Sequence, residues 1–256
     1  MLGRVTLDGL RWLGEAQLLL QQALGLIARG RIRRSETVQE MAVLGFDSVP
    51  IVLLTMLAVG MVLALNTARQ IVGRGLTPYA GGLVAISVAR EAGPVLAAVV
   101  VAARVGSAIA AELGSMKITE QVDAMRALAV SPVEYLVVPR LVAGVVMLPV
   151  LVVLADVAGG AGAYMIGITQ GIPPQEFIRS VQQFLTLPDL FGGLAKSAVF
   201  GFIIAMVACH VGLRTGGGAE GVGRSTTSAV VISIVLIYLS DYPLTWVILA
   251  FTGFTL

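Results

Sequence analysis

Apolar residues run along this 256-residue chain in five long stretches that are separated by polar segments. The first stretch lies between Asp47 and Arg69, where no charged residue interrupts it, and it is long enough to cross a hydrocarbon layer of about 30 Å. Four more stretches lie near residues 76–111, 139–168, 190–213 and 226–252. This pattern predicts an all-α integral membrane protein with five membrane-spanning helices.

The composition strengthens this prediction. Hydrophobic residues make up 57% of the chain and charged residues only 12%, and the mean hydropathy is +0.93. Soluble proteins carry about 25% charged residues, so this chain lacks the polar surface that water would require. The net charge of +2 gives no reason to expect a nucleic-acid partner, and the single cysteine, Cys209, excludes a disulfide framework within the chain.

Four of the five apolar stretches contain or border a charge. Arg90 and Glu91 lie in the second stretch, and the later ones carry Asp156, Lys196 and Asp241. A charge at the centre of a membrane helix costs about 2.5–3.5 kcal/mol on insertion scales, so it usually faces a cavity or a partner. Pro94 follows closely and leaves a carbonyl one turn back without its helical donor, which favours a kink. The alternative is that Arg90 and Glu91 extend to nearby headgroups.

Arginine and lysine are unevenly divided between the two sides of the predicted spans. With the N-terminus inside, the inner segments hold eleven of them: Arg4, Arg11, Arg29, Arg31, Arg33, Arg34, Lys117, Arg126, Arg140, Arg214 and Arg224. The outer segments hold three: Arg69, Arg74 and Arg179. Because cytoplasmic segments are enriched in these residues, we expect a cytoplasmic N-terminus and, after five spans, Leu256 on the outer side.

Residues 1–48 are expected to form a separate N-terminal region of cytoplasmic or interfacial helices, ahead of the membrane-spanning region at 49–256. Leucine and isoleucine recur at helical spacing at Leu10, Leu13, Leu20, Leu24 and Ile27. This predicts an amphipathic helix in the membrane interface, with the basic run "RGRIRR" near anionic headgroups. "TVQE" at 37–40 matches a capping box and predicts the start of a second helix.

The segment "GSMKITEQVDAMRALAVSP", residues 114–132, predicts an amphipathic helix over about 115–130 on the cytoplasmic side. Ser115 is its expected cap and Ser131-Pro132 its expected end. One face carries an apolar stripe, and the polar face pairs Lys117 with Glu120 and Asp123 with Arg126. The stripe consists of Ile118, Val122, Met125 and Ala129.

Two other features of the sequence, a loop-like glycine pattern and a lone histidine, could suggest nucleotide or metal binding, but neither site is complete. "GAEGVGRS" at 218–225 resembles a phosphate-binding loop, but Arg224 replaces the lysine and a membrane span precedes it. We therefore expect a glycine-rich turn between the fourth and fifth spans, with no nucleotide bound. His210 is the only histidine, too few for a metal site, and packing is its expected role. No residues suggest an enzyme.

Two longer motifs resemble a known family. "REAGPVLAAVVVAARVGSAIAAELGSMKITEQVDAMRALAVSPVEYLVVPR", residues 90–140, and "GVGRSTTSAVV", residues 221–231, are similar to the signature regions of the MlaE/YrbE permeases. These are membrane subunits of ABC transporters that work with MCE-domain lipid-binding proteins. The resemblance spans roughly residues 35–250 and is weaker in the N-terminal helix.

The resemblance implies a permease that moves phospholipid or a related lipid across a bacterial inner membrane. It implies a second permease copy, two ATPase subunits that carry Mg-ATP, an MCE-domain hexamer on the outer side, and no cofactor in this chain. Arg90 and Glu91 match the family's polar pair near the lipid, and span one supplies wall candidates in Met61, Leu63 and Leu65. The segment at 115–130 matches the family's coupling helix, with the expected ATPase contact at Lys117, Thr119, Glu120, Asp123 and Arg126.

Two questions stay open at this point. Small residues at 102–114 and 158–167 allow close helix packing in lipid, either between two copies or within one chain. A secondary transporter or channel driven by an ion gradient is the alternative function, and it would use Glu91, Asp156 and Asp241 as ion sites. Such proteins usually contain an internal repeat, and the chain shows none.

Overall fold

The computed structural model describes residues 2–71 and 76–251, and within them every regular element is a helix. Arg74 and Leu256, which the orientation argument used, lie outside the described residues. The elements are α1 (Leu2–Ala28), α2 (Arg34–Gly45), η1 (Phe46–Ser48), α3 (Val49–Ile71), η3 (Thr77–Tyr79), α4 (Ala80–Ser87), η4 (Val88–Ala92), α5 (Gly93–Val101), η5 (Ala102–Gly106), α6 (Ser107–Ile118), α7 (Gln121–Ala127), η6 (Val133–Val137), α8 (Val138–Thr169), α9 (Pro174–Phe184), α10 (Leu187–Leu213) and α11 (Gly218–Phe251).

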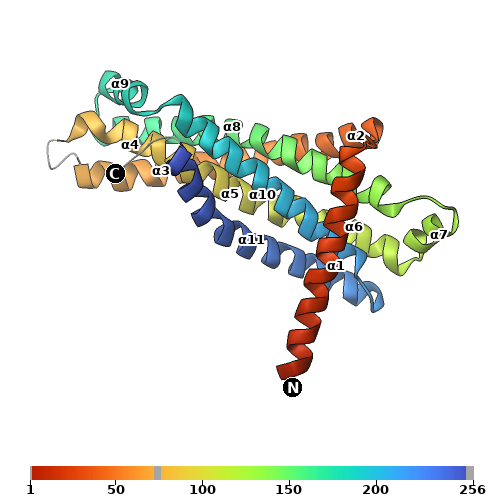
Figure 1. Ribbon diagram of the computed structural model, residues 1–256. Helices are drawn as coiled ribbons and strands as arrows, with labels where there is room; N and C mark the ends of the chain where they lie inside the picture. The colour runs from red at the N-terminus through yellow and green to blue at the C-terminus, as the bar shows by residue number, and fades with distance from the viewer. Residues whose placement is uncertain (1, 72–75, 252–256) are drawn as a thin grey trace.

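Five helical segments of the described chain are long and apolar enough to cross a membrane, as the sequence predicts. They are Arg34–Gln70, Thr77–Ile118, Val133–Thr169, Leu187–Leu213 and Gly218–Ala250. Their long axes run side by side, and α1 crosses the bundle near one end, where α7 also lies (Figure 1). The other end carries α4 and α9 (Figure 1). We call these the α7 end and the α9 end.

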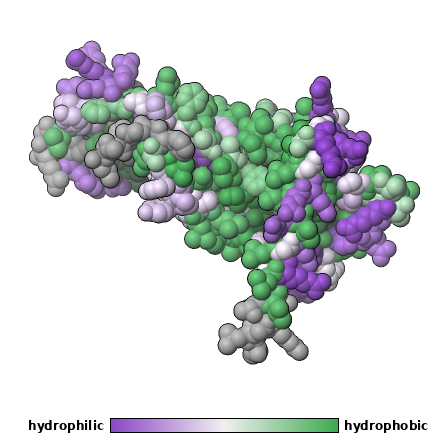
Figure 2. All heavy atoms as spheres, in the orientation of Figure 1, coloured by the Kyte–Doolittle hydropathy of each residue, from purple (hydrophilic) through white to green (hydrophobic). Residues whose placement is uncertain are grey.

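The surface divides along the same axis. Figure 2 shows a hydrophobic band around the middle of the bundle and hydrophilic residues gathered toward its two ends. Large apolar side chains are exposed on the membrane-spanning helices, among them Leu54 on α3, Val157 on α8 and Leu239 on α11. Lipid chains solvate such a band, whereas water would not, so the structure has the surface of a membrane protein.

Close packing of α3 against α8 depends on glycine. A methyl group added at Gly60 would press on the carbonyl oxygen of Gly159, and one added at Gly162 would press on the carbonyl oxygen of Leu57. Small residues let helix backbones approach in lipid, where burial supplies little driving force. Gly159 and Gly162, two glycines of the 158–167 stretch, therefore allow close packing within one chain. A methyl group added at Gly160 would have no atom within 4 Å.

The N-terminal helix forms as predicted but divides its apolar residues between two faces. Leu20 and Ile27 pack against the core, whereas Leu10, Leu13 and Leu24 are exposed. The indole of Trp12 meets His210 of α10 edge-on at 4.8 Å between ring centroids, so His210 has the packing role that we expected. One face of α1 thus rests on the bundle, and the other is available to membrane lipid.

The predicted capping box at "TVQE" is wrong. Helix α2 begins at Arg34, three residues earlier, and its N-cap Arg33 makes no side-chain cap. Thr37 lies inside the first turn, where its hydroxyl donates to the carbonyl of Arg33 at 2.8 Å. The guanidinium of Arg33 packs over the ring of Tyr135 at 4.5 Å, so the basic run is anchored partly to the protein itself.

A turn joins the fourth and fifth spans, but it covers residues 214–217, whereas the glycine-rich segment 218–225, which we expected to form the turn, is the helical start of α11. Gly217 and Gly218 have φ values of 83° and 68°, a backbone conformation that glycine adopts without strain. Helix α11 starts at Gly218, and Arg224 lies in its second turn, 4.0 Å from Glu220.

Candidate functional site

The second span is interrupted by a π-helical turn, η4, which contains Arg90 and Glu91. Pro94 follows it and has no N–H, so it cannot donate to the carbonyl of Arg90 one turn back. The N–H of Gly93 donates instead to Val88, five residues earlier. The carbonyl of Arg90 accepts a hydrogen bond from Lys196 Nζ at 3.2 Å. The sequence predicted a distortion at this point of the second span. A side chain from another span, Lys196, supplies a hydrogen bond to the distorted backbone.

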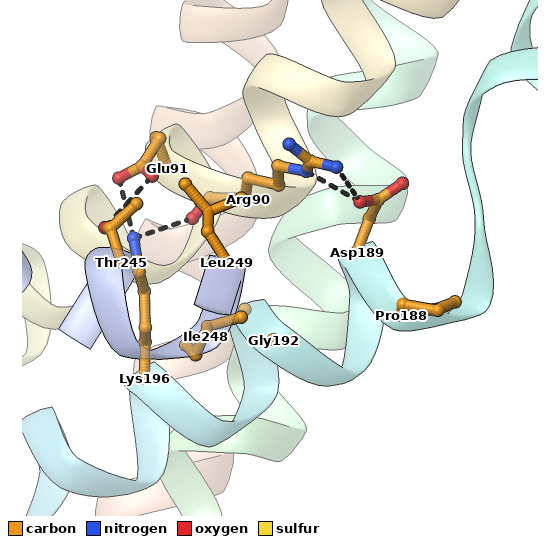
Figure 3. A pocket seen from close by; sticks show the side chains of 10 residues that line it. Arg90, Glu91, Pro188, Asp189, Gly192, Lys196, Thr245, Ile248 and Leu249 are labelled. Atoms are coloured by element: carbon orange, nitrogen blue, oxygen red, sulfur yellow. Dashed lines mark hydrogen bonds and ion pairs between the residues drawn. The ribbon is translucent and has the colours of Figure 1, made fainter. Parts of the chain in front are cut away.

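Lys196 on α10 is the centre of an ionic cluster (Figure 3). Its Nζ lies 2.8 Å from Glu91 Oε2 and 2.9 Å from Asp241 Oδ1 on α11, and its side chain is only 3% exposed. The hydroxyl of Thr245 on α11 donates to Glu91 Oε1 at 3.3 Å. Since a buried ammonium is costly unless it is paired, the two carboxylates and the carbonyl account for its place inside the bundle.

Arg90 is held by Asp189, which lies on α10 about two turns before Lys196. Arg90 Nε donates to Asp189 Oδ1 at 2.6 Å, and a guanidinium nitrogen, Nη2, contacts the same oxygen. The second oxygen of Asp189 accepts from the backbone N–H and the hydroxyl of Thr186, which forms the capping box of α10. One carboxylate thus starts α10 and fixes Arg90, which couples the position of Arg90 to the α9 end of that helix.

Helix α10 reaches these groups because Gly193 has no side chain. A methyl group added there would press on the carbonyl oxygen of Ala89 in η4. Asp189, Gly193 and Lys196 follow one another at helical spacing, so the side of α10 that touches η4 carries an anion, a gap and a cation in turn. We call Arg90, Glu91, Asp189, Lys196 and Asp241 the ionic cluster.

The ionic cluster borders a cavity of about 20 Å³, which is enough for roughly one water molecule. Ile248 and Leu249 of α11 form part of its wall. Glu91 and Arg90 keep the largest exposed fractions of the cluster, 45% and 28%. The alternative from the sequence was that Arg90 and Glu91 extend outward to lipid headgroups, but in the structure they pair with Asp189 and Lys196 of α10. The site therefore presents adjacent groups of opposite charge beside an apolar wall. Among the described residues, no group of three His, Cys, Asp or Glu side chains is arranged to hold a metal ion.

The other predicted pathway residues lie elsewhere. Met61, Leu63 and Leu65 are half-buried on α3, and none of them lines the cavity at the ionic cluster. Asp189 and Thr245 were not predicted as site residues. Lys196 and Asp241 were recognised as charges within spans, but their pairing with Glu91 was not. The sequence does place a cation in one span and carboxylates in two others, and this combination of charges could have indicated that they pair.

The predicted coupling segment lies at the α7 end, away from the ionic cluster, and it differs in detail from the expected helix. Helix α6 continues through Ser115 to Ile118, the chain turns at Glu120 with a φ of 61°, and α7 covers only Gln121–Ala127. Ser115 is therefore not a cap. Ala129, expected on the apolar stripe, is exposed beyond the helix with a φ of 58°, whereas Val122 is fully buried.

Charged side chains hold this turn together, and one of the two predicted pairs is present: Asp123 pairs with Arg126, whereas Lys117 pairs with Asp123 and not with Glu120. Lys117 Nζ pairs with Asp123 Oδ2 at 2.7 Å, and Arg126 Nη1 pairs with Asp123 Oδ1 at 2.9 Å. Thr119 accepts a hydrogen bond from Gln121 at 3.1 Å, and Glu120 is exposed. The hydrogen bond from Lys117, helped by the charge of Arg126, holds the pKa of Asp123 below its ordinary value despite some desolvation.

Comparison with known proteins identifies the family. Residues 37–247 match the family described as Permease MlaE. The chain is 47% identical over 230 residues to a probable ABC transporter permease of Synechocystis sp., covering 90% of this chain and 88% of that protein. It is 39% identical over 246 residues to a probable ABC transporter permease of Rickettsia typhi, covering 96% and 95%. It is 37% identical over 235 residues to the chloroplastic protein TRIGALACTOSYLDIACYLGLYCEROL 1 of Arabidopsis thaliana, covering 91% and 67%.

These matches extend over nearly the whole bundle, including η4, α7 and the glycine-rich turn. The relatives named as permeases are transport subunits, and no enzyme activity is part of those names. The chain belongs to the MlaE family of ABC transporter permeases.

Proposed function

We propose that this chain is the permease subunit that moves phospholipid or a related lipid between a bacterial inner membrane and an MCE-domain partner. A separate ATPase subunit supplies the energy by hydrolysing Mg-ATP. In this proposal the α7 end is cytoplasmic, because most of the arginine and lysine outside the spans lies in segments at that end. The α9 end then faces the outer side, where the MCE-domain hexamer would dock.

The ionic cluster is the observation that carries this proposal. A zwitterionic lipid headgroup contains an ammonium or similar group and a phosphate, and Glu91 and Arg90 present the matching charges side by side. Both side chains keep exposed surface, whereas Lys196 and Asp189 behind them are nearly buried. The apolar side chains of Ile248 and Leu249 on α11 adjoin this point and suit acyl chains, and Met61, Leu63 and Leu65 are candidates farther along the pathway, on α3.

The name of one relative supports a lipid substrate. The Arabidopsis protein carries the name of a glycerolipid, a diacylglycerol with three galactose units. That name belongs to the relative, and this chain shares 37% of the aligned residues with it. Together with the ionic cluster beside apolar helix faces, it favours a lipid over a small polar solute.

The remaining partners are proposed from the distribution of surface. Helix α11 exposes a row of large apolar residues, including Val231, Tyr238 and Trp246, which suits a second permease copy packed against lipid-facing helices. At the α7 end, Leu128 and Glu120 are exposed next to α7, which suits an ATPase groove that receives a short helix. Lys117, Thr119, Asp123 and Arg126 would stabilise that turn or contact the ATPase directly.

The ion-gradient alternative is weaker on two counts. Family membership makes the chain an ABC permease, and such a transporter is driven by an ATPase. In addition, Lys196 lies between Glu91 and Asp241, so both carboxylates already share one fixed cation. An ion-binding carboxylate needs to exchange its cation during transport.

Co-purification tests the proposal. The chain, with an affinity tag, is expressed with its host's candidate ATPase and MCE-domain protein, and the intact complex is weighed by native mass spectrometry. We expect two copies of this chain, two ATPases, six MCE-domain subunits and bound lipid. A chain that purifies as a functional transporter without any ATPase would overturn the proposal.

A further inference from the structure

A larger cavity lies on the opposite side of η4 from the ionic cluster. It measures about 750 Å³ and lies between α4, η4, α8, α9 and the start of α10. Val88 and Ala89 of η4 face this cavity, whereas the next two residues, Arg90 and Glu91, line the small cavity of the ionic cluster. We call the larger one the α9 cavity. Its size falls in the range of about 300–1,000 Å³ that is typical of ligand pockets.

The wall of the α9 cavity is almost entirely apolar. Residues such as Val157 and Phe177 dominate it, and the polar side chains that line it belong to Asp156, Tyr164 and Gln182. No lysine or arginine is among the described residues that line it. Because α8 is a membrane-spanning helix, lipid is the medium from which such a cavity fills.

Asp156 is the unusual member of this wall. Its Oδ1 is buried and accepts no hydrogen bond from the part of the chain that the structure describes. A methyl group added at Gly93 would press on this same oxygen, so the carboxyl packs directly against the backbone that follows η4. Because Oδ1 is enclosed by this packing, a partner in the α9 cavity reaches the carboxyl through its other oxygen, Oδ2. A carboxyl on a membrane helix is costly unless it is paired, and this one lines an apolar cavity, which indicates a partner that the described residues do not supply.

We propose that the α9 cavity binds a lipid whose polar head donates hydrogen bonds, and that Asp156 accepts them. The donor is an ammonium N–H or a hydroxyl, and Tyr164 and Gln182 are placed on the same wall to bind its ester or phosphate oxygens. A head that carries a trimethylammonium has no such donor. This inference rests on the proposed lipid function and adds a second site that selects among headgroups.

The position of the α9 cavity suits this role. Gly93 and Asp156 are in contact, so the occupant of the cavity adjoins the turn that carries Arg90 and Glu91. A lipid bound there lies on one side of η4 while the ionic cluster lies on the other. Selection at Asp156 is therefore next to the proposed transport pathway but does not use its residues.

Lipid enrichment tests the inference. The complete complex is incorporated into nanodiscs that contain equal amounts of phosphatidylethanolamine, phosphatidylglycerol and phosphatidylcholine with identical acyl chains. After the complex is extracted, tightly bound lipid is quantified by mass spectrometry. We expect roughly tenfold enrichment over phosphatidylcholine of the lipid that donates, since a hydrogen bond to a charged group is among the stronger ones. Enrichment of phosphatidylethanolamine identifies an ammonium donor, and enrichment of phosphatidylglycerol identifies hydroxyl donors.

Two pairs of variants separate this site from others. Asp156→Leu should abolish the enrichment, while Asp156→Asn, which keeps an acceptor, should retain part of it. Ala161→Trp places a large ring in the cavity wall and should reduce bound lipid, whereas Val153→Trp, on the same helix but outside the cavity, should not. ATP-dependent lipid transfer is measured for each variant in parallel.

The outcomes distinguish this inference from the proposed function. If the wild-type complex transfers lipid but shows no preference over phosphatidylcholine, or if Asp156→Leu keeps the preference, the inference is wrong and the proposed function stands. If Ala161→Trp releases a protein subunit and leaves bound lipid unchanged, the cavity is a docking site for a partner helix and the inference is again wrong. Failure of the wild-type complex to transfer any lipid would contradict the proposed function instead.

Discussion

The Nζ of Lys196 lies 2.8 Å from the Oε2 of Glu91, although the two residues are 105 positions apart and belong to different membrane spans. The same nitrogen lies 2.9 Å from Asp241 on a third span. One buried cation therefore joins α10, α11 and η4, and it also satisfies the carbonyl that Pro94 leaves without a donor. Charged side chains are costly in membrane-spanning helices, but here Glu91, Lys196 and Asp241 pair with one another and link three spans.

Replacing Lys196 by methionine should destabilise the protein strongly. The change removes the only cation between Glu91 and Asp241 among the described contacts and leaves two carboxylates facing each other. Removal of one member of a buried ion pair costs about 3–5 kcal/mol. The midpoint of thermal unfolding in detergent, followed by intrinsic fluorescence, should fall by many degrees.

Lys117→Met is the matched control, because its pair with Asp123 lies at the surface, where solvent screens ion pairs and they contribute little to stability. Equal midpoints for Lys196→Met and Lys117→Met would show that the ionic cluster does not stabilise the bundle.

The glycine contact between α3 and α8 makes a second prediction. Gly60→Ala should lower stability by about 1–3 kcal/mol, because the new methyl group would press on the backbone of Gly159. Gly160→Ala, next to that contact, has no atom within 4 Å of the new group and should be neutral or stabilising. Denaturant or thermal midpoints of the two purified variants decide the point, and a loss in both would contradict it.

Much of this fold could be predicted from the sequence because lipid imposes simple rules. Long, mainly apolar stretches predicted the five spans, and Pro94 next to Gly93 predicted a distortion in the second one. The paired partners were not predictable, since Asp189 and Thr245 lie about a hundred and about 150 residues beyond the residues they contact. The polar side chains at 37–40 matched a capping pattern, but Thr37 donates to Arg33 inside a helix that had already begun. Local patterns give a residue's options, and tertiary contacts select among them.

The Lys117–Asp123 contact predicts a specific response to pH. The hydrogen bond from Lys117 keeps the pKa of Asp123 below its ordinary value in the folded protein. The contact is therefore fully present above the pKa of an ordinary aspartate, about 3.9, and is lost only as the pH falls through the lower folded value. In protein labelled with ¹³C at aspartate, the carboxyl signal of Asp123 should titrate below the other exposed aspartates. Lys117→Ala should return it to their range, and an unchanged titration would contradict the assignment.

The turn at α7 is predicted to transmit movement from the ATPase. Glu120→Lys combined with Asp123→Lys should reduce ATPase co-purification or uncouple ATP hydrolysis from lipid transfer, while the permease still inserts. Because Asp123 also holds the turn together, Glu120→Lys alone is the cleaner test of a direct contact.

Glu120→Gly serves as the control for backbone effects at this position. It removes the charge and relaxes a φ of 61° that suits glycine better than glutamate. Normal ATPase binding and lipid transfer in Glu120→Lys and in the double variant would exclude the docking role of these carboxylates.

The account's central claim is that the ionic cluster belongs to the lipid pathway, and ATP-dependent transfer of a labelled phospholipid by the reconstituted complex tests it most directly. Glu91→Ala removes the most exposed carboxylate of the cluster and leaves Lys196 paired with Asp241, so the complex should assemble and hydrolyse ATP but transfer lipid at least tenfold more slowly. Glu36→Ala, which removes a carboxylate from a surface ion pair on α2, is the control and should transfer at the wild-type rate. A wild-type transfer rate in assembled Glu91→Ala complexes would contradict the claim.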